Sequence, residues 1–76
     1  MDNVRQSRKV PADITEPIRR AREEQQRSQR DVAKAAGVSR RAVSELENGA
    51  EVRVTTLTAI AGALGLAVRI TSDLAA

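Results

Sequence analysis

A chain of 76 residues with 13 basic and 10 acidic side chains, and a formal net charge of +3, predicts one small domain whose core alone gives marginal stability. It contains no cysteine and no histidine, which excludes disulfides, zinc fingers and most nucleophile–base catalytic sites, so we expect no enzymatic activity and no cofactor or metal. It also lacks the aromatic rings on which single-stranded nucleic acids stack. No apolar run approaches the roughly 18 residues of a membrane span, so we expect a cytoplasmic protein.

The first twelve residues show no helical or strand periodicity and include three basic side chains, Arg5, Arg8 and Lys9. Short polar chain ends of this kind are usually poorly ordered, so residues 1–12 are predicted to form a flexible basic tail. The excess of positive charge lies in residues 1–49, which hold 11 basic and 8 acidic side chains, whereas residues 50–76 hold two of each.

The first predicted helix begins at Asp13 or Thr15 and ends near Gln26. Its apolar residue Ile18 is expected to face the core. Arg22, one turn later, is placed to form an ion pair with a neighbouring helix. We expect such a pair to orient the helices rather than to stabilise them strongly, since exposed ion pairs contribute only about 0 to 1 kcal/mol.

Residues 28–49, SQRDVAKAAGVSRRAVSELENG, carry the strongest local signals in the chain. Ser28 is placed to cap a helix by accepting a hydrogen bond from the backbone N–H of Asp31. Gly37 predicts the end of that helix, because glycine adopts the left-handed conformation of a helix C-cap without steric cost. Ser39 then caps a second helix after a very short turn. Two helices joined this tightly form a helix-turn-helix.

The second helix of the pair has the form of a DNA recognition helix. Val43 and Leu46 face inward. Arg40 and Arg41 begin its outward side, which is the part of such a helix that enters the major groove. The other interpretation, an ordinary helical hairpin with solvated arginines, requires the cap, glycine and apolar positions to coincide by accident. DNA is therefore the expected partner, and the basic tail has an alternative role as an arm that wraps the duplex or enters the minor groove.

An apolar helix is predicted after a short connection that contains a weak strand pattern at residues 51–54. Thr55 or Thr56 is expected to cap this helix, and Gly65 to end it. Its buried stripe consists of Leu57, Ile60, Ala61 and Leu64. The helical DNA-binding domain thus spans residues 13–65.

Residues 66–71, LAVRIT, alternate between apolar and other side chains, which predicts a β-strand. A lone strand leaves its backbone N–H and C=O groups unpaired. We therefore expect it to pair with the same strand of a second chain, so that residues 66–76 join two domains into a homodimer. Two alternatives stay open: the segment extends the core, or it pairs with residues 51–54.

The stretch from Ile18 to about Ile70 resembles the Cro/CI-type helix-turn-helix regulators of the Xre family. Within that family, VSRRAVSELENG, VRVTTL and ALGL before a strand look most like HipB-type antitoxins. The resemblance implies an all-α, lambda-repressor-like domain of four to five helices with a short C-terminal β-strand that pairs across a dimer. It also implies binding to operator DNA and repression of the protein's own operon, together with a HipA-type kinase toxin.

The resemblance assigns DNA contacts by position. Gln29 matches a residue that holds a phosphate. Asn48 lies in a turn whose amides approach phosphate, and Ser39 and Ser44 match positions near the DNA backbone. The positions that match readers of base edges are Arg40, Arg41, Ala42 and Glu45. The chemistry of these side chains suits base reading. Arginine donates to guanine O6 and N7, an alanine methyl group contacts the thymine methyl group, and glutamate accepts a hydrogen bond from cytosine N4.

Arg22 and Glu47 match a pair that commonly links the first and third helices. Glu45 has a second interpretation, in which it supports Arg41 one turn earlier. Where the family usually has glycine and then leucine, this chain has Gln26 and Arg27, and we expect the stem of Arg27 to cover the core in place of leucine.

The expected function is therefore a transcriptional regulator that binds double-stranded DNA as a homodimer on an inverted repeat, in the cytoplasm and associated with the nucleoid. The alternative is a protein-interaction module that neutralises a toxin and has weak or no specific DNA binding. Gln29, Arg40 and Arg41 argue against that alternative, because they match the positions that hold phosphate and read bases.

Overall fold

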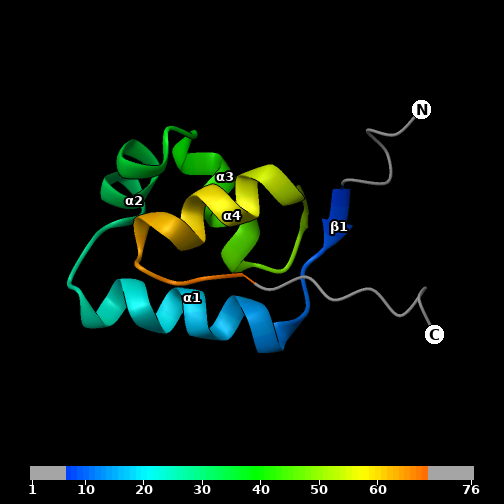
Figure 1. The fold of residues 1–76 in the computed structure, drawn as a ribbon, viewed down its shortest axis with the longest axis horizontal. Helices are drawn as coiled ribbons and strands as arrows, with labels where there is room; N and C mark the ends of the chain where they lie inside the picture. Colours follow the sequence, from blue (N-terminus) through cyan, green and yellow to red (C-terminus); the bar gives the residue numbers. More distant parts are fainter. Residues whose placement is uncertain (1–6, 69–76) are drawn as a thin grey trace.

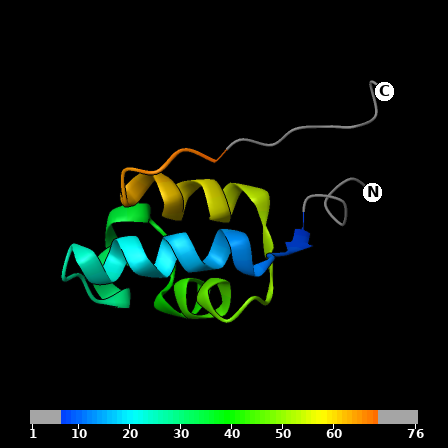
Figure 2. The ribbon, with the colours of Figure 1, turned by 90° about the horizontal axis from the view of Figure 1, so that it is seen from below.

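The computed structural model describes residues 7–68, which form four helices and a two-stranded antiparallel sheet. The elements in chain order are β1 (Ser7–Lys9), α1 (Ala12–Glu24), α2 (Gln29–Ala36), α3 (Arg40–Glu47), β2 (Glu51–Arg53) and α4 (Val54–Ala63). Figure 1 shows α1 running along one side of α2, α3 and α4, and Figure 2 shows it in front of α3 and α4. The predicted lambda-repressor-like helical architecture is confirmed.

The predicted boundaries of the helix-turn-helix are confirmed in detail. The Ser28 hydroxyl accepts a hydrogen bond from the backbone N–H of Asp31 at 3.0 Å, and the Asp31 carboxylate accepts one from the N–H of Ser28 at 3.0 Å. This reciprocal capping box begins α2. Gly37 ends α2 with φ +74°, and the Ser39 hydroxyl then caps α3 by accepting from the N–H of Ala42 at 3.1 Å. The short turn between α2 and α3 therefore follows from signals within a few residues of it.

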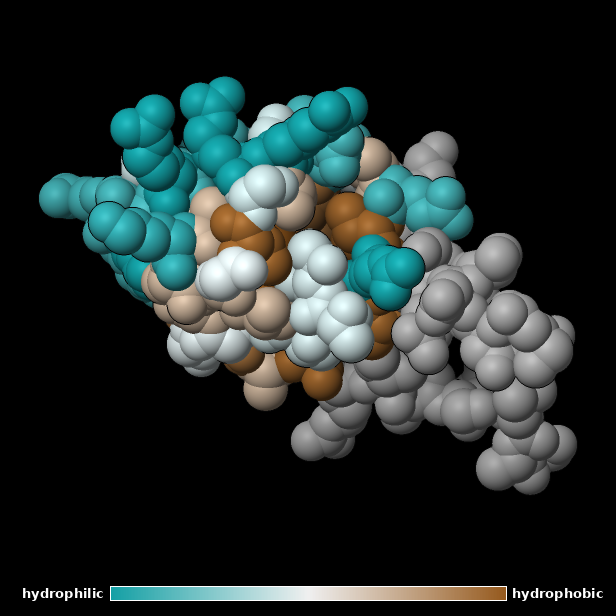
Figure 3. All heavy atoms as spheres, turned by 90° about the horizontal axis from the view of Figure 1, so that it is seen from above, coloured by the Kyte–Doolittle hydropathy of each residue, from teal (hydrophilic) through white to brown (hydrophobic). Residues whose placement is uncertain are grey.

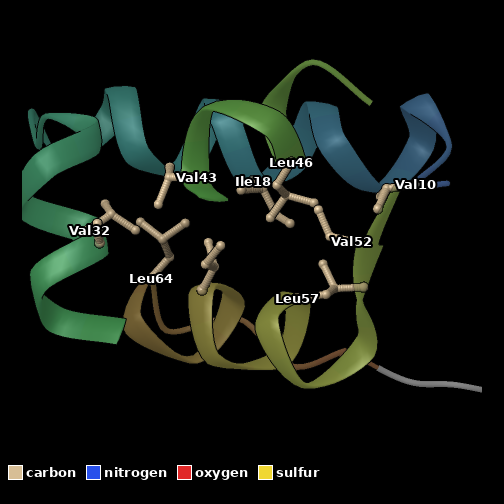
Figure 4. Close-up of a cluster of buried hydrophobic side chains, with 10 residues drawn as sticks. Val10, Ile18, Val32, Val43, Leu46, Val52, Leu57 and Leu64 are labelled. Atoms are coloured by element: carbon tan, nitrogen blue, oxygen red, sulfur yellow. The ribbon is translucent and has the colours of Figure 1, made fainter. Parts of the chain in front are cut away.

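A single apolar core joins all six elements or their immediate neighbours (Figure 4). The buried hydrophobic residues that form it are Val10, Ile18, Val32, Ala33, Val43, Leu46, Val52, Leu57, Ile60 and Leu64. The predicted inward residues of α1 and α3 belong to it, and so does the predicted stripe of α4, in which Ala61 is 1% exposed. Fully burying one such aliphatic side chain contributes about 1.5 to 3 kcal/mol.

The prediction that residues 1–12 form a flexible tail is wrong from residue 7 onward. β1 pairs with β2, Val10 is buried in the core, and Pro11 is the N-cap of α1. α1 therefore begins at Ala12, before Asp13 and Thr15, and the carbonyl oxygen of Pro11 accepts two N–H groups of its first turn. The prediction failed because burial of Val10 and pairing with β2 depend on residues far along the chain. Residues 1–6 lie outside the described part.

The predicted start of α4 is also wrong. This helix begins at Val54, and its N-cap is Arg53, whose side chain makes no capping hydrogen bond. The strand β2 leads directly into the helix, so Thr55 and Thr56 already lie in its first turn. The carbonyl oxygen of Thr55 instead accepts a hydrogen bond from the Thr58 hydroxyl at 3.0 Å.

The C-terminal segment differs from the predicted strand over the part that the structure describes. Residues 66–68 are in neither helix nor strand, and β2 pairs with β1, so the predicted alternative of pairing with residues 51–54 is wrong for them. Leu66 and Val68 pack against the core, as the other alternative predicts for these two residues. Gly65, with φ +79°, turns the chain back along α4 (Figure 1). The rest of the predicted strand, residues 69–71, and the C-terminal tail to residue 76 lie outside the described residues.

Candidate nucleic-acid interface

The helix α3 is held by its apolar face and presents its N-terminal arginines to solvent. Val43 and Leu46 are both 0% exposed. Ala33 of α2, 4% exposed, is small enough to let the two helices approach closely. Arg40 and Arg41 are exposed. Figure 3 shows hydrophilic side chains crowded along one border of the face that includes α2 and α3.

A shallow hollow between the N-terminal parts of α2 and α3 is lined by Arg22, Ser28, Gln29, Arg30 and Arg40. We call it the arginine hollow. Three of the five lining residues are arginines, and none of the five is acidic. Guanidinium groups suit phosphate oxygens, and the positive end of the α2 dipole adds to the field. The hollow can therefore hold an anion such as a backbone phosphate.

Two residues of the arginine hollow are held by the carboxylate of Glu47, near the end of α3. Arg22 donates from Nε to Oε2 of Glu47 at 2.6 Å and from Nη2 to Oε1 at 3.0 Å. Gln29 donates from Nε2 to the same Oε1 at 3.1 Å. The predicted pair of Arg22 and Glu47 is confirmed, and the Gln29 contact adds α2 to the link. One carboxylate thereby orients a predicted phosphate ligand.

The pair is buried rather than exposed, which corrects the expected environment. The side chain of Glu47 is 3% exposed and that of Arg22 is 16% exposed. Arg19 also donates to the backbone carbonyl of Glu47 at 2.9 Å, and Arg22 donates to the carbonyl of Arg27 at 3.0 Å. The network connects α1, the α1–α2 turn, α2 and α3. Removing one partner would leave a buried charge uncompensated, which costs much more than an exposed pair contributes.

The electrostatics of this network keep both partners ionised. Burial acts most strongly on Glu47 and on its own would raise the pKa, but hydrogen bonds from Arg22 and Gln29 and the nearby positive charges hold the pKa below its ordinary value. The hydrogen bond to Glu47 raises the pKa of Arg22. The network is therefore intact at neutral pH.

On the outward side of α3, Arg41 and Glu45 form an exposed pair one helical turn apart. Arg41 Nε donates to Glu45 Oε2 at 3.1 Å, and the two side chains are 86% and 44% exposed. The interpretation that Glu45 supports Arg41 is thus confirmed. Among the described residues, Glu45 is the only hydrogen-bond partner of the Arg41 guanidinium group, whose other nitrogen atoms can face a ligand.

The structure divides the other predicted contact residues into three positions. Gln29 and Arg40 meet in the arginine hollow. Ala42 and Ser44 are half-buried on α3, and the Ser39 hydroxyl is engaged in the helix cap. Asn48 is exposed at the opposite end of α3. Their assignment as DNA contacts stays a prediction.

Sequence reasoning missed two residues of the arginine hollow, Arg22 as a lining residue and Arg30. Arg30 directly follows Gln29 in the first turn of α2 and lines the same hollow. Arg22 was assigned only a structural pairing, because its approach to Gln29 depends on how α1 packs on α3. Because Arg30 is a basic residue directly after Gln29, the sequence alone could have indicated it as a further residue of the hollow.

A helix-turn-helix family model, HTH_3, matches residues 18–70, which is more than half of the chain. The chain belongs to the HTH_3 family. This HTH_3 domain covers the capped pair α2 and α3 and the core that supports them, and it makes the protein a DNA-binding regulator in general terms. No curated protein matches the sequence. Within residues 7–68, no helix has the length and apolar character needed to cross a membrane.

The turn between α1 and α2 of the HTH_3 domain accommodates its unusual residues with polar contacts. Gln26 adopts φ +55°, the left-handed region that favours the glycine usual in the family pattern. Arg27 is half-buried, and its Nη1 donates to the carbonyl of Ala63 at 2.7 Å. The Gln25 amide donates to the carbonyl of Leu64 at 2.9 Å. This turn therefore caps the C-terminal end of α4, which a leucine side chain cannot do.

Proposed function

We propose that this HTH_3 protein is a sequence-specific regulator that binds double-stranded operator DNA and represses its own operon. The observation that supports the proposal most strongly is the meeting of Arg22, Arg30 and Arg40 beside Gln29, where α3 begins. A backbone phosphate in the arginine hollow would bring the N-terminal residues of α3 to the base edges. Phosphate contacts position a protein on the duplex, and base contacts specify the sequence.

In this proposal the outward side of α3 reads the major groove. Arg40 and Arg41 offer donor pairs for O6 and N7 of guanine. Ala42 offers a methyl group to thymine, and Glu45 orients Arg41 through their hydrogen bond. Ser39, Ser44 and Asn48 lie toward the DNA backbone.

We further propose a homodimer that places two α3 helices in successive major grooves of an inverted repeat, about 34 Å apart. The support is an apolar hollow between α1 and the C-terminal segment, which includes Ile14, Pro17, Leu66 and Val68 in its lining. An isologous interface uses the same patch on both subunits. The segment from Val54 to Val68 has no charged residue, and the one charged residue that lines the hollow is Asp13 of α1.

The finer proposal is that the regulator is a HipB-like antitoxin with a HipA-type kinase toxin as partner, in the cytoplasm near the nucleoid. The support for this proposal is that VSRRAVSELENG, VRVTTL and ALGL resemble the corresponding segments of HipB-type antitoxins. The second candidate function, a toxin-neutralising module with weak or no specific DNA binding, is favoured by the same uncharged surface. We propose no enzymatic activity, because the buried carboxylate of Glu47 is ionised and paired with Arg22 and is not available for acid–base chemistry.

Fluorescence anisotropy with the protein's own promoter DNA and with random DNA tests the main proposal. The salt concentration should be about 150 mM, because lower salt exaggerates phosphate binding. A preference for the promoter of roughly a thousandfold or more supports a specific regulator. Equal and weak binding to both duplexes contradicts it and favours the toxin-neutralising module.

Light scattering tests the dimer separately. The wild type should have twice the monomer mass of 8.2 kDa. Ala67, exposed in the lining of the apolar hollow, should weaken association when it is replaced by glutamate, whereas Lys34→Glu on the exposed side of α2 should not. A wild-type monomer at the concentrations of the DNA assay would contradict the dimer.

A further inference from the structure

The turn between α1 and α2 binds the end of α4 with two side chains that also contact each other. Arg27 Nη1 donates to the carbonyl oxygen of Ala63 at 2.7 Å and to Oε1 of Gln25 at 3.1 Å. Gln25 Nε2 donates to the carbonyl oxygen of Leu64 at 2.9 Å. The last carbonyl groups of a helix have no partner within the helix, so these two side chains satisfy them. We call Gln25 and Arg27, with the two carbonyl groups that they bind, the turn clamp.

The turn clamp surrounds a residue in an unfavourable backbone conformation. Gln26, between the two clamp residues, has φ +55° and is the only residue other than glycine with positive φ in the described part of the chain. A side chain with a Cβ atom rarely adopts this left-handed conformation, because the Cβ atom lies too close to a backbone carbonyl oxygen. Such a conformation persists where the surrounding contacts determine it. We therefore expect the path of the turn to depend on the contacts of Gln25 and Arg27.

The same turn is also bound to the arginine hollow. Arg22, which lines the hollow, donates from Nη1 to the backbone carbonyl oxygen of Arg27 at 3.0 Å. Ser28 and Gln29, the next residues along the chain, line the hollow as well. Arg27 therefore contacts the proposed phosphate site through its backbone and the end of α4 through its side chain.

The carbonyl groups of the turn clamp lie where the chain leaves α4. Gly65 follows them with φ +79°, and the next three residues, Leu66, Ala67 and Val68, line the apolar hollow. Figures 1 and 2 show the α1–α2 turn and the end of α4 at the same end of the molecule. The turn clamp thus fixes the point from which one wall of the apolar hollow begins.

We propose that the turn clamp couples the two surfaces, so that a DNA phosphate in the arginine hollow strengthens the association of two copies at the apolar hollow. This inference rests on the proposed function, because it requires DNA at one hollow and a second copy at the other. An anion that binds Arg22 and Gln29 restricts the turn, and the turn restricts the end of α4 through Arg27. Order that DNA has already imposed is not lost again when the second copy binds. By reciprocity, association strengthens DNA binding by the same factor, and Arg27 is a positioning residue for both surfaces.

The test is the dissociation constant of the dimer, measured by sedimentation equilibrium with and without a promoter duplex of one half-site, about 10 base pairs. A single half-site binds one protomer, so it cannot bring two copies together as an inverted repeat does. Arg27→Leu and Gln25→Ala each remove one side chain of the turn clamp. Arg20→Leu is the matched control, because it makes the same change of charge at an exposed position of α1. Thermal melting of each variant shows whether it is folded.

We expect the half-site duplex to lower the dissociation constant of the wild-type dimer by about 5- to 150-fold, and that of Arg20→Leu by the same factor. The factor should fall toward one in Arg27→Leu and decrease in Gln25→Ala. A dissociation constant that DNA leaves unchanged in the wild type, or an equal factor in wild type and both folded clamp variants, overturns the coupling and leaves the proposed function standing. A wild type that does not bind promoter DNA overturns the proposed regulator, and one that stays monomeric with and without DNA overturns the proposed homodimer; the coupling falls with either.

Discussion

Two segments pack into the same core but differ in the charge of their surfaces: Gln29 to Glu47, and Val54 to Val68. The first contains seven charged residues, and the second contains none. The first places its charges around the arginine hollow and on the outward side of α3, whereas the second leaves small and apolar side chains beside an apolar hollow. The difference teaches that one small core supports two surfaces of different character. In the proposed function the charged surface binds DNA and the uncharged surface binds a second protein chain.

The largest expected effect comes from breaking the network that holds the charged segment against α1. Glu47→Ala leaves the guanidinium of Arg22 buried without its carboxylate and frees Gln29. We expect a loss of about 3 to 5 kcal/mol in the free energy of unfolding, measured by urea titration.

A double variant separates the missing charge from the missing packing. Arg22→Met combined with Glu47→Leu removes both charges and keeps apolar volume, so it should be less destabilising than Glu47→Ala alone. A loss below about 1 kcal/mol for Glu47→Ala would contradict the account, because exposed ion pairs contribute no more than that.

The next effect concerns the charged surface alone. Arg40→Ala or Arg41→Ala should weaken promoter binding by about 1 to 3 kcal/mol and relax specificity at one or two base pairs. Gln29→Ala should instead weaken binding to promoter and random DNA alike, since it removes the proposed phosphate contact. Competition binding against single-base operator variants measures the difference. Equal losses on promoter and random DNA for both arginine variants would remove the assigned base-reading role.

The same substitution, glycine to alanine, should have opposite effects in the two segments. Gly37 has φ +74°, so alanine there should cost about 1 to 2 kcal/mol of stability, although no atom lies within 4 Å of the new methyl group. Gly62 lies inside α4, exposed and with equal space, so alanine should stabilise the protein by about 0.5 to 1 kcal/mol. Thermal unfolding of both variants provides the measurement. Changes of the same sign would contradict the capping role of Gly37.

The smallest effect is the pH dependence of stability. The pKa of Glu47 is lowered in the folded protein, so its contribution is present above the unfolded value, about 4.3, and is lost as the pH falls through the folded value. The wild type should therefore lose more stability than Glu47→Gln between pH 7 and about pH 3. Asp31, whose pKa is lowered mainly by its hydrogen bond with the Ser28 backbone, contributes equally to both proteins. Parallel loss in both proteins would contradict the role of Glu47.

The helix-turn-helix could be predicted from the sequence because its signals are local. The caps at Ser28 and Ser39 and the stop at Gly37 act within three or four residues. The apolar positions Val43 and Leu46 repeat with the period of the same helix. The predicted cap of α4 failed even at this range, because the strand β2 runs directly into the helix.

The elements that depend on distant partners could not be predicted in the same way. Pairing of Ser7–Lys9 with Glu51–Arg53 is set by packing of Val10 and Val52 in the core, and no signal within the first twelve residues reports it. In the site, the Arg22 and Glu47 pair was expected, but its burial and its contact with Gln29 require the packed helices. The sequence therefore predicts Gln29 and Arg40 as contact residues, but not that they meet Arg22 in one hollow.

The most direct test of the central claim, that the arginine hollow and the outward side of α3 bind DNA, is a nuclear magnetic resonance titration. Backbone amide shifts of the ¹⁵N-labelled protein are followed as promoter duplex is added. We expect the largest shift changes at Ser28–Arg30 and Arg40–Glu45, with smaller changes in α4. Largest changes confined to Val54–Val68, with Arg40–Glu45 unaffected, would contradict that claim.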